Sequence, residues 1–499
     1  MTASIDLKPT NTGKVADEAG SDERVGETVE ATFTPEEERR VLRKIDMVVL
    51  PFMCFTFMLQ YLDKQSLSYA GVFGLIDDLN LTSKEYSWTS SIFYVGQLVS
   101  EYPFIYLMSR FPLTKFVGAT VIVWGIVCLC LAAPQNFAGF AAVRFLLGFF
   151  EGAVSPAFVT ITSIWWRKEE HATRTAIWVT MNGLAQVLGC LIMYGIGKNT
   201  ALPLQPWRTM FLVCGALTVS AGIGFFTLMP SGPKDAWFLN AREKEILSAR
   251  MAQDREGGDK ESFSMEQFKE TMLDPRAWFI FMFGVLVTMQ SPVLTFATLM
   301  INRIGYSKLQ TMLFTAPSGA VQICFIWIGV ALCKIFPKNR VLVVWILNIT
   351  PLVGCVLLLK LPSESRWGVI VAAWLASCAS AVMSVLLSLS ASNIKGNTKR
   401  ATVNTMFFIG YCAGCIGSPQ LWTESPRYTN GVITAIVTWV TLYLVSGLYR
   451  VVCTRENKKR DLAMAESGPQ ASTHVVLDKN GMPKTDLTDI EDKMFRYSS

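Results

Sequence analysis

The chain has 499 residues, of which 51% are hydrophobic and only 17% are charged, and its mean hydropathy is +0.35. This composition is typical of polytopic membrane proteins and excludes an ordinary soluble enzyme. The net charge of +6 is spread over short polar segments rather than gathered on one basic face, which argues against nucleic acid as a partner.

Twelve apolar windows follow one another along the chain, each close to the ~20 residues that a helix needs to cross a bilayer. They lie near 47–69, 87–109, 114–133, 138–163, 174–197, 208–229, 277–300, 309–333, 341–360, 367–392, 401–423 and 430–452. We therefore predict an all-α polytopic membrane protein with twelve transmembrane helices.

A polar stretch at 231–275 divides these windows into two sets of six, and the two sets resemble each other. The basic turn at 110–115 has an echo at 334–340, and Arg174 has one at Arg400, both at an offset of about 225 residues. The repeated offset predicts two pseudo-symmetric six-helix bundles.

Basic residues beside the first and last windows place both tails in the cytoplasm. The expected parts are a disordered N-terminal tail (1–40), an N-terminal bundle (41–230), a cytoplasmic linker (231–275), a C-terminal bundle (276–453) and a disordered C-terminal tail (454–499).

The first window carries two charges in its second half, in the run Tyr61-Leu62-Asp63-Lys64. Neighbouring helical side chains point ~100° apart, so Asp63 and Lys64 should line a broad wet surface rather than pair with each other. The alternative is that these charges only mark the outer end of the helix.

The fourth window carries Arg144 and Glu151 inside an otherwise apolar run. Seven residues bring the two side chains back to within ~20° of each other on one helix face. A charge at the bilayer centre costs roughly 2.5–3.5 kcal/mol on insertion scales, so this face should meet a cavity or the bundle interior. The alternative is that the two charges only tie helices together. Gly148 and Gly152, four residues apart, should let another helix backbone come close.

The cores of the later windows offer amides, hydroxyls and rings in place of charges. The candidates to line a cavity are Gln290, Asn404 and Tyr411, joined by Asn182 and Gln186 from the fifth window, although the last two could serve helix packing alone. With only two histidines in the chain, at 171 and 474, a histidine relay is excluded and carboxylates must bind any protons.

Charged residues near the ends of the windows are expected to have structural or gating roles. They are Glu101, which lies near Pro103 and could link to Arg110, together with Arg110, Lys115, Arg174 and Arg400. Asn80-Leu81-Thr82 forms a glycosylation sequon on the outer side. All twelve cysteines fall inside or at the ends of windows, so we expect no metal site and no cofactor.

Several short motifs recur together in a known family. They are Arg43-Lys44-Ile45-Asp46, Asp63-Lys64, Glu101-x-Pro103, Arg110-Phe111-Pro112, Arg144-x-x-x-Gly148-x-x-Glu151, Pro156, Trp166-x-x-x-Glu170-x-x-x-Arg174, Trp207-Arg208, Asn397-Thr398-Lys399-Arg400, Gly417-x-Pro419-Gln420 and Pro426-x-Tyr428. With this set, the chain resembles the anion:cation symporter type of the major facilitator superfamily, and within it the fungal allantoate permease group. The resemblance covers residues 41–453. Lys64 stands where the family usually has arginine, and Cys415 where we would expect asparagine, which leaves the substrate open.

The resemblance implies that Asp63 and Glu151 bind protons, that Arg144 couples to Glu151, and that Lys64 and Arg144 attract an anionic substrate. Tyr61 is a further candidate to bind substrate. We expect a multi-pass carrier that moves a small organic anion with protons across the lipid bilayer, and we expect it to be a monomer in the plasma membrane. A proton-coupled exporter of a fungal metabolite and a nutrient receptor that only signals remain as alternatives. An enzyme is not expected, because no nucleophile, base and orienting group converge.

Overall fold

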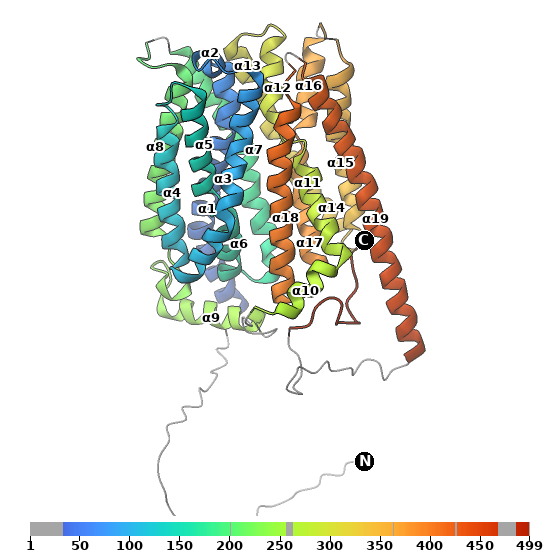
Figure 1. Ribbon diagram of the computed structural model, residues 1–499. Helices are drawn as coiled ribbons and strands as arrows, with labels where there is room; N and C mark the ends of the chain where they lie inside the picture. Colours follow the sequence, from blue (N-terminus) through green and yellow to red (C-terminus); the bar gives the residue numbers. More distant parts are fainter. Residues whose placement is uncertain are drawn as a thin grey trace, which may run out of the picture.

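The computed structural model describes residues 33–199, 201–255, 263–362, 364–424, 427–467 and 486–498. The predicted tail residues 1–32 and 468–485, and Pro426 of the last motif, lie outside these ranges. Within them the protein is helical without any β-strand, and its long helices stand side by side in one bundle (Figure 1).

Two halves and a polar connection make up the bundle. The N-terminal half contains α1 (Pro35–Val72), α2 (Leu75–Asp78), α3 (Ser83–Arg110), α4 (Leu113–Cys130), α5 (Phe137–Glu151), α6 (Val154–Trp165), α7 (Lys168–Lys198) and α8 (Pro206–Leu228). The connection contains η1 (Pro233–Asp235), α9 (Ala241–Arg255) and α10 (Met265–Leu273). The C-terminal half contains α11 (Pro275–Thr288), α12 (Pro292–Arg303), α13 (Lys308–Thr315), α14 (Pro317–Ile335), α15 (Arg340–Lys360), α16 (Arg366–Ala376), α17 (Ala379–Asn393), α18 (Asn397–Gly417), η2 (Ser418–Leu421) and α19 (Thr429–Ser467).

The predicted fold of twelve membrane helices is confirmed. Ten helices of the described ranges are long and apolar enough to cross a membrane, when each kinked pair is counted as one. The other two spans are α3 and α18, whose serine, tyrosine and asparagine side chains lower their hydropathy. These two more polar helices lie against each other between the two halves, where Tyr94 meets Tyr411 with ring centroids 6.1 Å apart.

Four of the predicted spans are interrupted, and three of the interruptions have a proline in the first turn that follows. Pro156 cannot donate to the carbonyl of Gly152, and this is where α5 gives way to α6. Pro292 and Pro317 follow the breaks between α11 and α12 and between α13 and α14. An interrupted membrane helix frees backbone groups that must find partners in the protein interior or at a cavity. Glu151 and Gln290 lie at two of these breaks.

The close helix approach predicted from Gly148 is present in the structure. A Cβ on Gly148 would overlap the backbone carbonyl oxygen of Phe93, and a Cβ on Gly96 would overlap that of Phe145. α3 and α5 therefore touch backbone to backbone, as small residues permit in membrane helices. This contact sets how Arg144 and Glu151 on α5 are placed against α3.

Replacing Gly148 with alanine is therefore expected to lower the melting temperature of the purified protein, because α3 and α5 must separate to admit the methyl group. The matched control is Gly195→Ala on α7, where an added Cβ meets nothing within 4 Å. This control should be neutral or slightly stabilising, since alanine favours helix over glycine by about 0.5–1 kcal/mol. Equal melting temperatures for the two variants would show that the α3–α5 contact is not tight.

We call the end of the bundle that carries α9, α10 and residues 486–498 the inner end, which is the lower end in Figure 1. At the opposite, outer end, hydrogen bonds join the two halves. Ser68 of α1 donates to the carbonyl of Thr295 at 2.9 Å, and Ser91 of α3 donates to that of Ile416 at 2.7 Å. Tyr86 also packs edge-on against Phe296, at 5.8 Å between ring centroids. The structure is thus closed at its outer end.

At the inner end, each ion-pair network stays within one half. In the N-terminal half, Arg250 of α9 pairs with Glu38 at 2.8 Å and with Glu170, and Arg167 pairs with Glu38 at 3.0 Å. In the described part of the chain no ion pair crosses from one half to the other. Among the described residues, the ion pairs at the inner end therefore join elements of the same half.

The C-terminal region differs from the disordered tail expected from residue 454. Helix α19 continues to Ser467 and projects below the bundle in Figure 1, and residues 486–498 pack onto the C-terminal half. The reason is a set of buried contacts, centred on Asp489 and Tyr497, that the polar composition of this region does not reveal.

Candidate functional site

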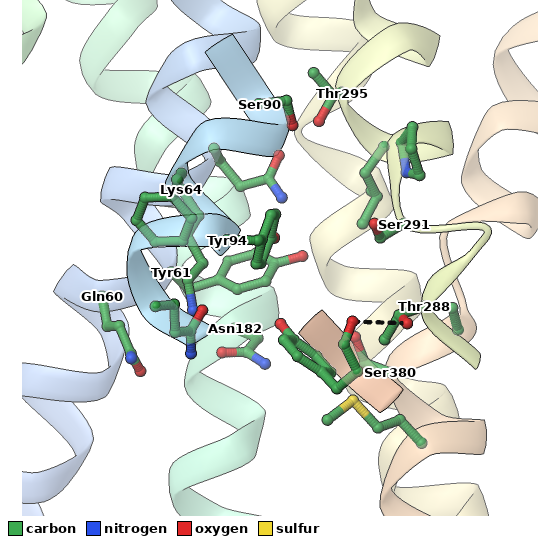
Figure 2. Close-up of a pocket in the computed structure, with 18 of the residues that line it drawn as sticks. Gln60, Tyr61, Lys64, Ser90, Tyr94, Asn182, Thr288, Ser291, Thr295 and Ser380 are labelled. Atoms are coloured by element: carbon green, nitrogen blue, oxygen red, sulfur yellow. Dashed lines mark hydrogen bonds between the residues drawn. The ribbon is translucent and has the colours of Figure 1, made fainter. Parts of the chain in front are cut away.

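A cavity of about 180 Å³ lies between the two halves, at the middle of the bundle. Figure 2 shows side chains from both halves converging on it: Gln60, Tyr61 and Lys64 from α1, Ser90 and Tyr94 from α3, Asn182 from α7, and Thr288, Ser291, Thr295 and Ser380 from the other half. The cavity is the natural place for a ligand, because it is concave and carries polar groups on both walls.

Arg144 is a buried cation on the cavity wall. The residue is 2% exposed, and its guanidinium lies over the ring of Phe93 at 5.5 Å and donates from Nε to the carbonyl of Thr89 at 3.2 Å. Its Nη1 has no hydrogen-bond partner among the described residues. A buried guanidinium that retains an unused donor can bind an incoming carboxylate or another planar anion.

Lys64 is the second cation on the wall, but it already has a partner. Its Nζ lies 3.0 Å from Oε1 of Glu151, whose side chain is fully buried. Arg144 makes no direct ion pair with Glu151 among the described residues, so the expected coupling of these two residues, which does not require contact, stays a prediction. The two residues lie two turns apart on α5, roughly 10 Å along the axis, and Lys64 from α1 reaches the carboxylate instead.

Asp63 does not line the cavity, contrary to the expectation of a shared wet surface. It is fully buried inside the N-terminal half, where Thr218 of α8 donates to its Oδ2 at 3.3 Å. Its Oδ1 has no hydrogen-bond partner among the described residues. The physical reason is the ~100° step between neighbouring helical side chains: with Lys64 facing the cavity, Asp63 must face the helices behind it.

The C-terminal wall of the cavity is neutral, in agreement with the absence of charge in the later windows. It presents hydroxyls, an amide, a thioether and aromatic rings, including Thr288, Gln290, Ser380 and Tyr411. Thr288 donates to the backbone carbonyl of Tyr411 at 3.1 Å and so links α11 to α18 beside the cavity. The two walls differ in kind: one carries positive charge, and the other offers neutral hydrogen bonds and shape.

Six of the eight residues predicted to bind substrate lie on the cavity wall: Tyr61, Lys64, Arg144, Asn182, Gln290 and Tyr411. Gln186 and Asn404 are not among its lining residues. Gln186 is 1% exposed and instead packs where α7 meets α14, close to Gly319. For Gln186 the alternative of helix packing fits the structure better.

The prediction missed other polar lining residues, namely Gln60, Gln65, Ser90, Tyr94, Gln97, Ser155, Thr288, Ser291, Thr295 and Ser380. A signal for some of them was present in the sequence. Gln60 stands four residues before Lys64, Tyr61 four before Gln65, and Ser90 four before Tyr94, the spacing that places two side chains on one helix face.

Three of the residues expected at the ends of the spans make contacts within the N-terminal half. Arg174 pairs with Asp46 at 2.8 Å, next to the Trp166 indole that donates to the same carboxylate. Arg110 lies over the ring of Tyr106 at 5.4 Å, and Lys115 lies over that of Phe226 at 5.3 Å.

The remaining positions of this group lie apart from one another. Glu101 is half-buried on α3, and no ion pair of the described residues links it to Arg110. Arg400 donates to the carbonyl of Ile394 at 3.2 Å, within the turn that precedes α18. Asn80 lies exposed in the turn between α2 and α3 with φ of 50°, where a sequon would be accessible.

Two bundles of six membrane helices around a central, polar cavity define a membrane transporter, not an enzyme. The family model of the major facilitator superfamily matches residues 53–419. The chain belongs to this superfamily, as its motifs indicated.

Several known proteins are similar to the chain over most of its length. An uncharacterised transporter of Schizosaccharomyces pombe is 35% identical and covers 93% of this chain and 88% of its own. The allantoate permease of Saccharomyces cerevisiae is 30% identical, and the match covers 95% of this chain and 88% of the permease. A thiamine pathway transporter of the same yeast is 30% identical, and the match covers 92% of this chain and 86% of that transporter. A bacterial homologue of the human lysosomal transporter Spinster, solved in an inward-facing conformation, has the same fold, with a TM-score of 0.59, 15% identity, and coverage of 84% and 97%.

Proposed function

We propose that the protein is a secondary carrier that moves a small organic anion, coupled to protons, by alternating access between the two sides of a membrane. The observation that carries this proposal is the buried Arg144 guanidinium, which faces the cavity without an acidic partner among the described residues. A carboxylate is the simplest ligand that would satisfy its charge and its fork of donors.

Glu151 provides a route for coupling. In the empty cavity it is paired with Lys64 at 3.0 Å. When a proton binds Glu151, the ion pair is lost and Lys64 is free to join Arg144 on the substrate carboxylate. Conversely, a carboxylate that draws Lys64 away leaves Glu151 buried without a cation, which favours the protonated acid. Proton and anion therefore assist each other's binding, as linkage requires.

Asp63 is the second proton site in this proposal. An ionised carboxylate buried without a cation is costly, and Thr218 supplies only one hydrogen bond. A proton on Glu151 alone makes the load electrically neutral when one monovalent anion travels with it, and a second proton on Asp63 gives the load a net charge of +1. Moving a single charge through 100 mV is worth about 2.3 kcal/mol, so the number of protons decides whether the membrane potential helps or opposes uptake.

The conformation fits one stage of this cycle. The halves are hydrogen-bonded at the outer end, and among the described residues each ion-pair network at the inner end stays within one half, as expected for a carrier that opens inward. We place the inner end in the cytoplasm and the carrier, as a monomer, in the plasma membrane.

The proposal is tested by uptake of labelled solutes into cells that lack their own carriers, with and without a protonophore. The panel holds allantoate and other small carboxylates, with thiamine as a cationic comparison, because two relatives have the names allantoate permease and thiamine pathway transporter. We expect a carboxylate to accumulate more than tenfold, protonophore to abolish the accumulation, and thiamine not to compete. Accumulation of thiamine in preference to every carboxylate would overturn the anion assignment.

A further inference from the structure

Residues 486–498, which we call the C-terminal clamp, are held to the inner end of the C-terminal half by a buried carboxylate. Asp489 is fully buried; its Oδ1 lies 2.9 Å from Nζ of Lys399, and its Oδ2 lies 3.4 Å from Nη2 of Arg276. Tyr497 of the same segment donates its hydroxyl to Oδ2 at 2.8 Å. One acidic residue thus joins the clamp to the starts of α11 and α18.

The far end of the clamp is bound in the manner of a peptide ligand. The ring of Tyr497 is 4% exposed and contacts two guanidinium groups, Arg276 at 4.3 Å and Arg460 at 4.8 Å. The Asn457 amide bonds both the backbone N–H and the carbonyl of Tyr497, at 2.9 and 2.8 Å. The Asn393 amide does the same for Ser498, at 2.7 and 2.8 Å. Such paired contacts to backbone groups fix the path of a chain, and the aromatic ring adds a large buried surface.

The N-terminal end of the clamp is hydrogen-bonded to the turn that joins α17 to α18. Asp486 accepts from the backbone N–H of Asn397 at 3.0 Å and from the Gln267 amide at 2.9 Å. Gly396 in this turn has φ of +97°, and a Cβ there would lie 3.2 Å from Thr488 of the clamp and 3.0 Å from the Gln267 side chain. The clamp therefore lies directly against Gly396, whose positive φ favours glycine.

The surface on which the clamp lies also contains charge pairs in which the clamp takes no part. Lys399 pairs with Glu270 and with Asp274, both at 2.8 Å, and Arg276 pairs with Asp274 at 2.9 Å. Two cations and two carboxylates already balance there, and Asp489 adds one further negative charge. Burial raises the pKa of the Asp489 carboxyl, against the opposing effect of Lys399 and Arg276. The helices can thus keep their contacts without the clamp, and docking of the clamp is a separable step.

The N-terminal half has an equivalent arrangement built from a different segment. There α9, which lies outside the bundle, inserts the buried Arg250 between Glu38 of α1 and Glu170 at the start of α7. In each half, one segment from outside the six helices holds the inner turn that leads into α7 or α18. A segment from outside the six helices thus stabilises the corresponding inner turn in both halves. We infer that stabilising these two turns matters for the movement of the halves.

We propose that the inner surface formed by α10, α11, the α17–α18 turn and α19 is a peptide-binding site, and that its occupant is the chain's own residues 486–498 acting as a detachable clamp. The chemistry that the site recognises is an acidic segment with a buried aspartate and, eight residues later, an aromatic ring between two guanidinium groups. Docking holds the inner ends of α11, α17, α18 and α19 as one unit, and release leaves the α17–α18 turn without support.

Thr488 gives the clamp a position at which a negative group would prevent docking. It is fully buried, donates its hydroxyl to Oε2 of Glu270 at 3.1 Å, and accepts from the N–H of Glu491 at 3.2 Å. A phosphate there would bring about two negative charges next to the carboxylates of Glu270, Glu491 and Asp489, where repulsion and desolvation both oppose binding.

The test uses the carrier truncated after Ser467, purified in detergent, together with a synthetic peptide of residues 485–499. We expect truncation to lower the melting temperature and saturating peptide to restore it. A peptide with Asp489→Asn should bind at least tenfold more weakly, since it removes the charge from a buried pair. The control peptide with Asp492→Asn should bind within about threefold of the unmodified one, because Asp492 pairs with the more exposed Lys395. A peptide carrying phosphothreonine at 488 should not bind.

A melting temperature unaffected by truncation, with no binding of the peptide, would overturn the proposal, and so would equal binding of the phosphorylated and unmodified peptides. If the truncated carrier does not fold, the full-length protein with Asp489→Asn answers the same question by trypsin digestion. The clamp contains Lys493 and Arg496, and it should be cut faster in this variant than in the wild type or in Asp492→Asn. None of these readouts needs a transported solute, so they fail or succeed independently of the proposed function.

Discussion

Replacing Glu151 with glutamine is expected to abolish proton-driven accumulation while leaving exchange of substrate across the membrane in place. Glutamine keeps the size of the side chain and can still accept a hydrogen bond from Lys64, but it cannot take up a proton. The ratio of internal to external substrate should fall from more than tenfold to one or below, because an inside-negative potential opposes entry of an anion that carries no proton with it. Counterflow, which needs only binding and alternation, should stay within about tenfold of the wild-type rate.

The matched control is Glu364→Gln, the same chemical change at an exposed position in the turn between α15 and α16. It should accumulate substrate as the wild type does. Protonophore-sensitive accumulation that survives in Glu151→Gln would remove Glu151 from the proton path and leave Asp63 as the candidate. Loss of both accumulation and counterflow would instead show that the acid is needed for the conformational change itself.

Replacing Arg144 with glutamine is expected to weaken substrate binding by at least thirtyfold. Its guanidinium is the cavity cation without an acidic partner among the described residues, and loss of one member of a buried charge pair costs about 2–5 kcal/mol. Arg144→Lys should restore only part of the affinity, because an ammonium cannot bind a carboxylate with two parallel N–H donors. The measurement is the concentration of unlabelled substrate that halves exchange.

Lys64→Arg provides the comparison for this variant. Arginine can pair with both Glu151 and a substrate carboxylate, so this change should alter affinity by no more than about threefold. The two results together separate a specific anion contact from a general need for positive charge. If Arg144→Gln bound substrate normally and Lys64→Arg did not, the roles assigned to the two cations would be exchanged.

Much of the architecture could be predicted from local patterns in the sequence. The apolar windows located the twelve spans, because hydropathy over about twenty residues depends on the segment itself and not on its neighbours. Gly148 indicated a close helix contact for a similar reason. Glycine has no side chain, so another helix can approach at this position whichever helix it is. The neutral character of the later windows likewise carried over directly to the C-terminal wall of the cavity.

The ion pairs were harder to predict, because each depends on the rotation and height of two helices. Arg144 and Glu151 share a helix face, yet Lys64 from α1 reaches the carboxylate. Asp63 and Lys64 are neighbours in the sequence, yet one faces the core of the N-terminal half and the other faces the cavity. Contacts between α1, α5 and α8 decide these outcomes, and no single segment contains that information.

The sequence by itself determined that the protein is a polytopic membrane protein, how many spans it has and which half carries the charge, since all three follow from composition and hydropathy along the chain. The tertiary structure alone decided which buried cation keeps an unused donor and which is already neutralised. It alone placed the acidic residues 486–498 on an inner surface that is far from them along the chain. The physical reason is that the cost of a charge in low dielectric is set by the groups within a few ångströms of it, and in this protein those groups come from other helices.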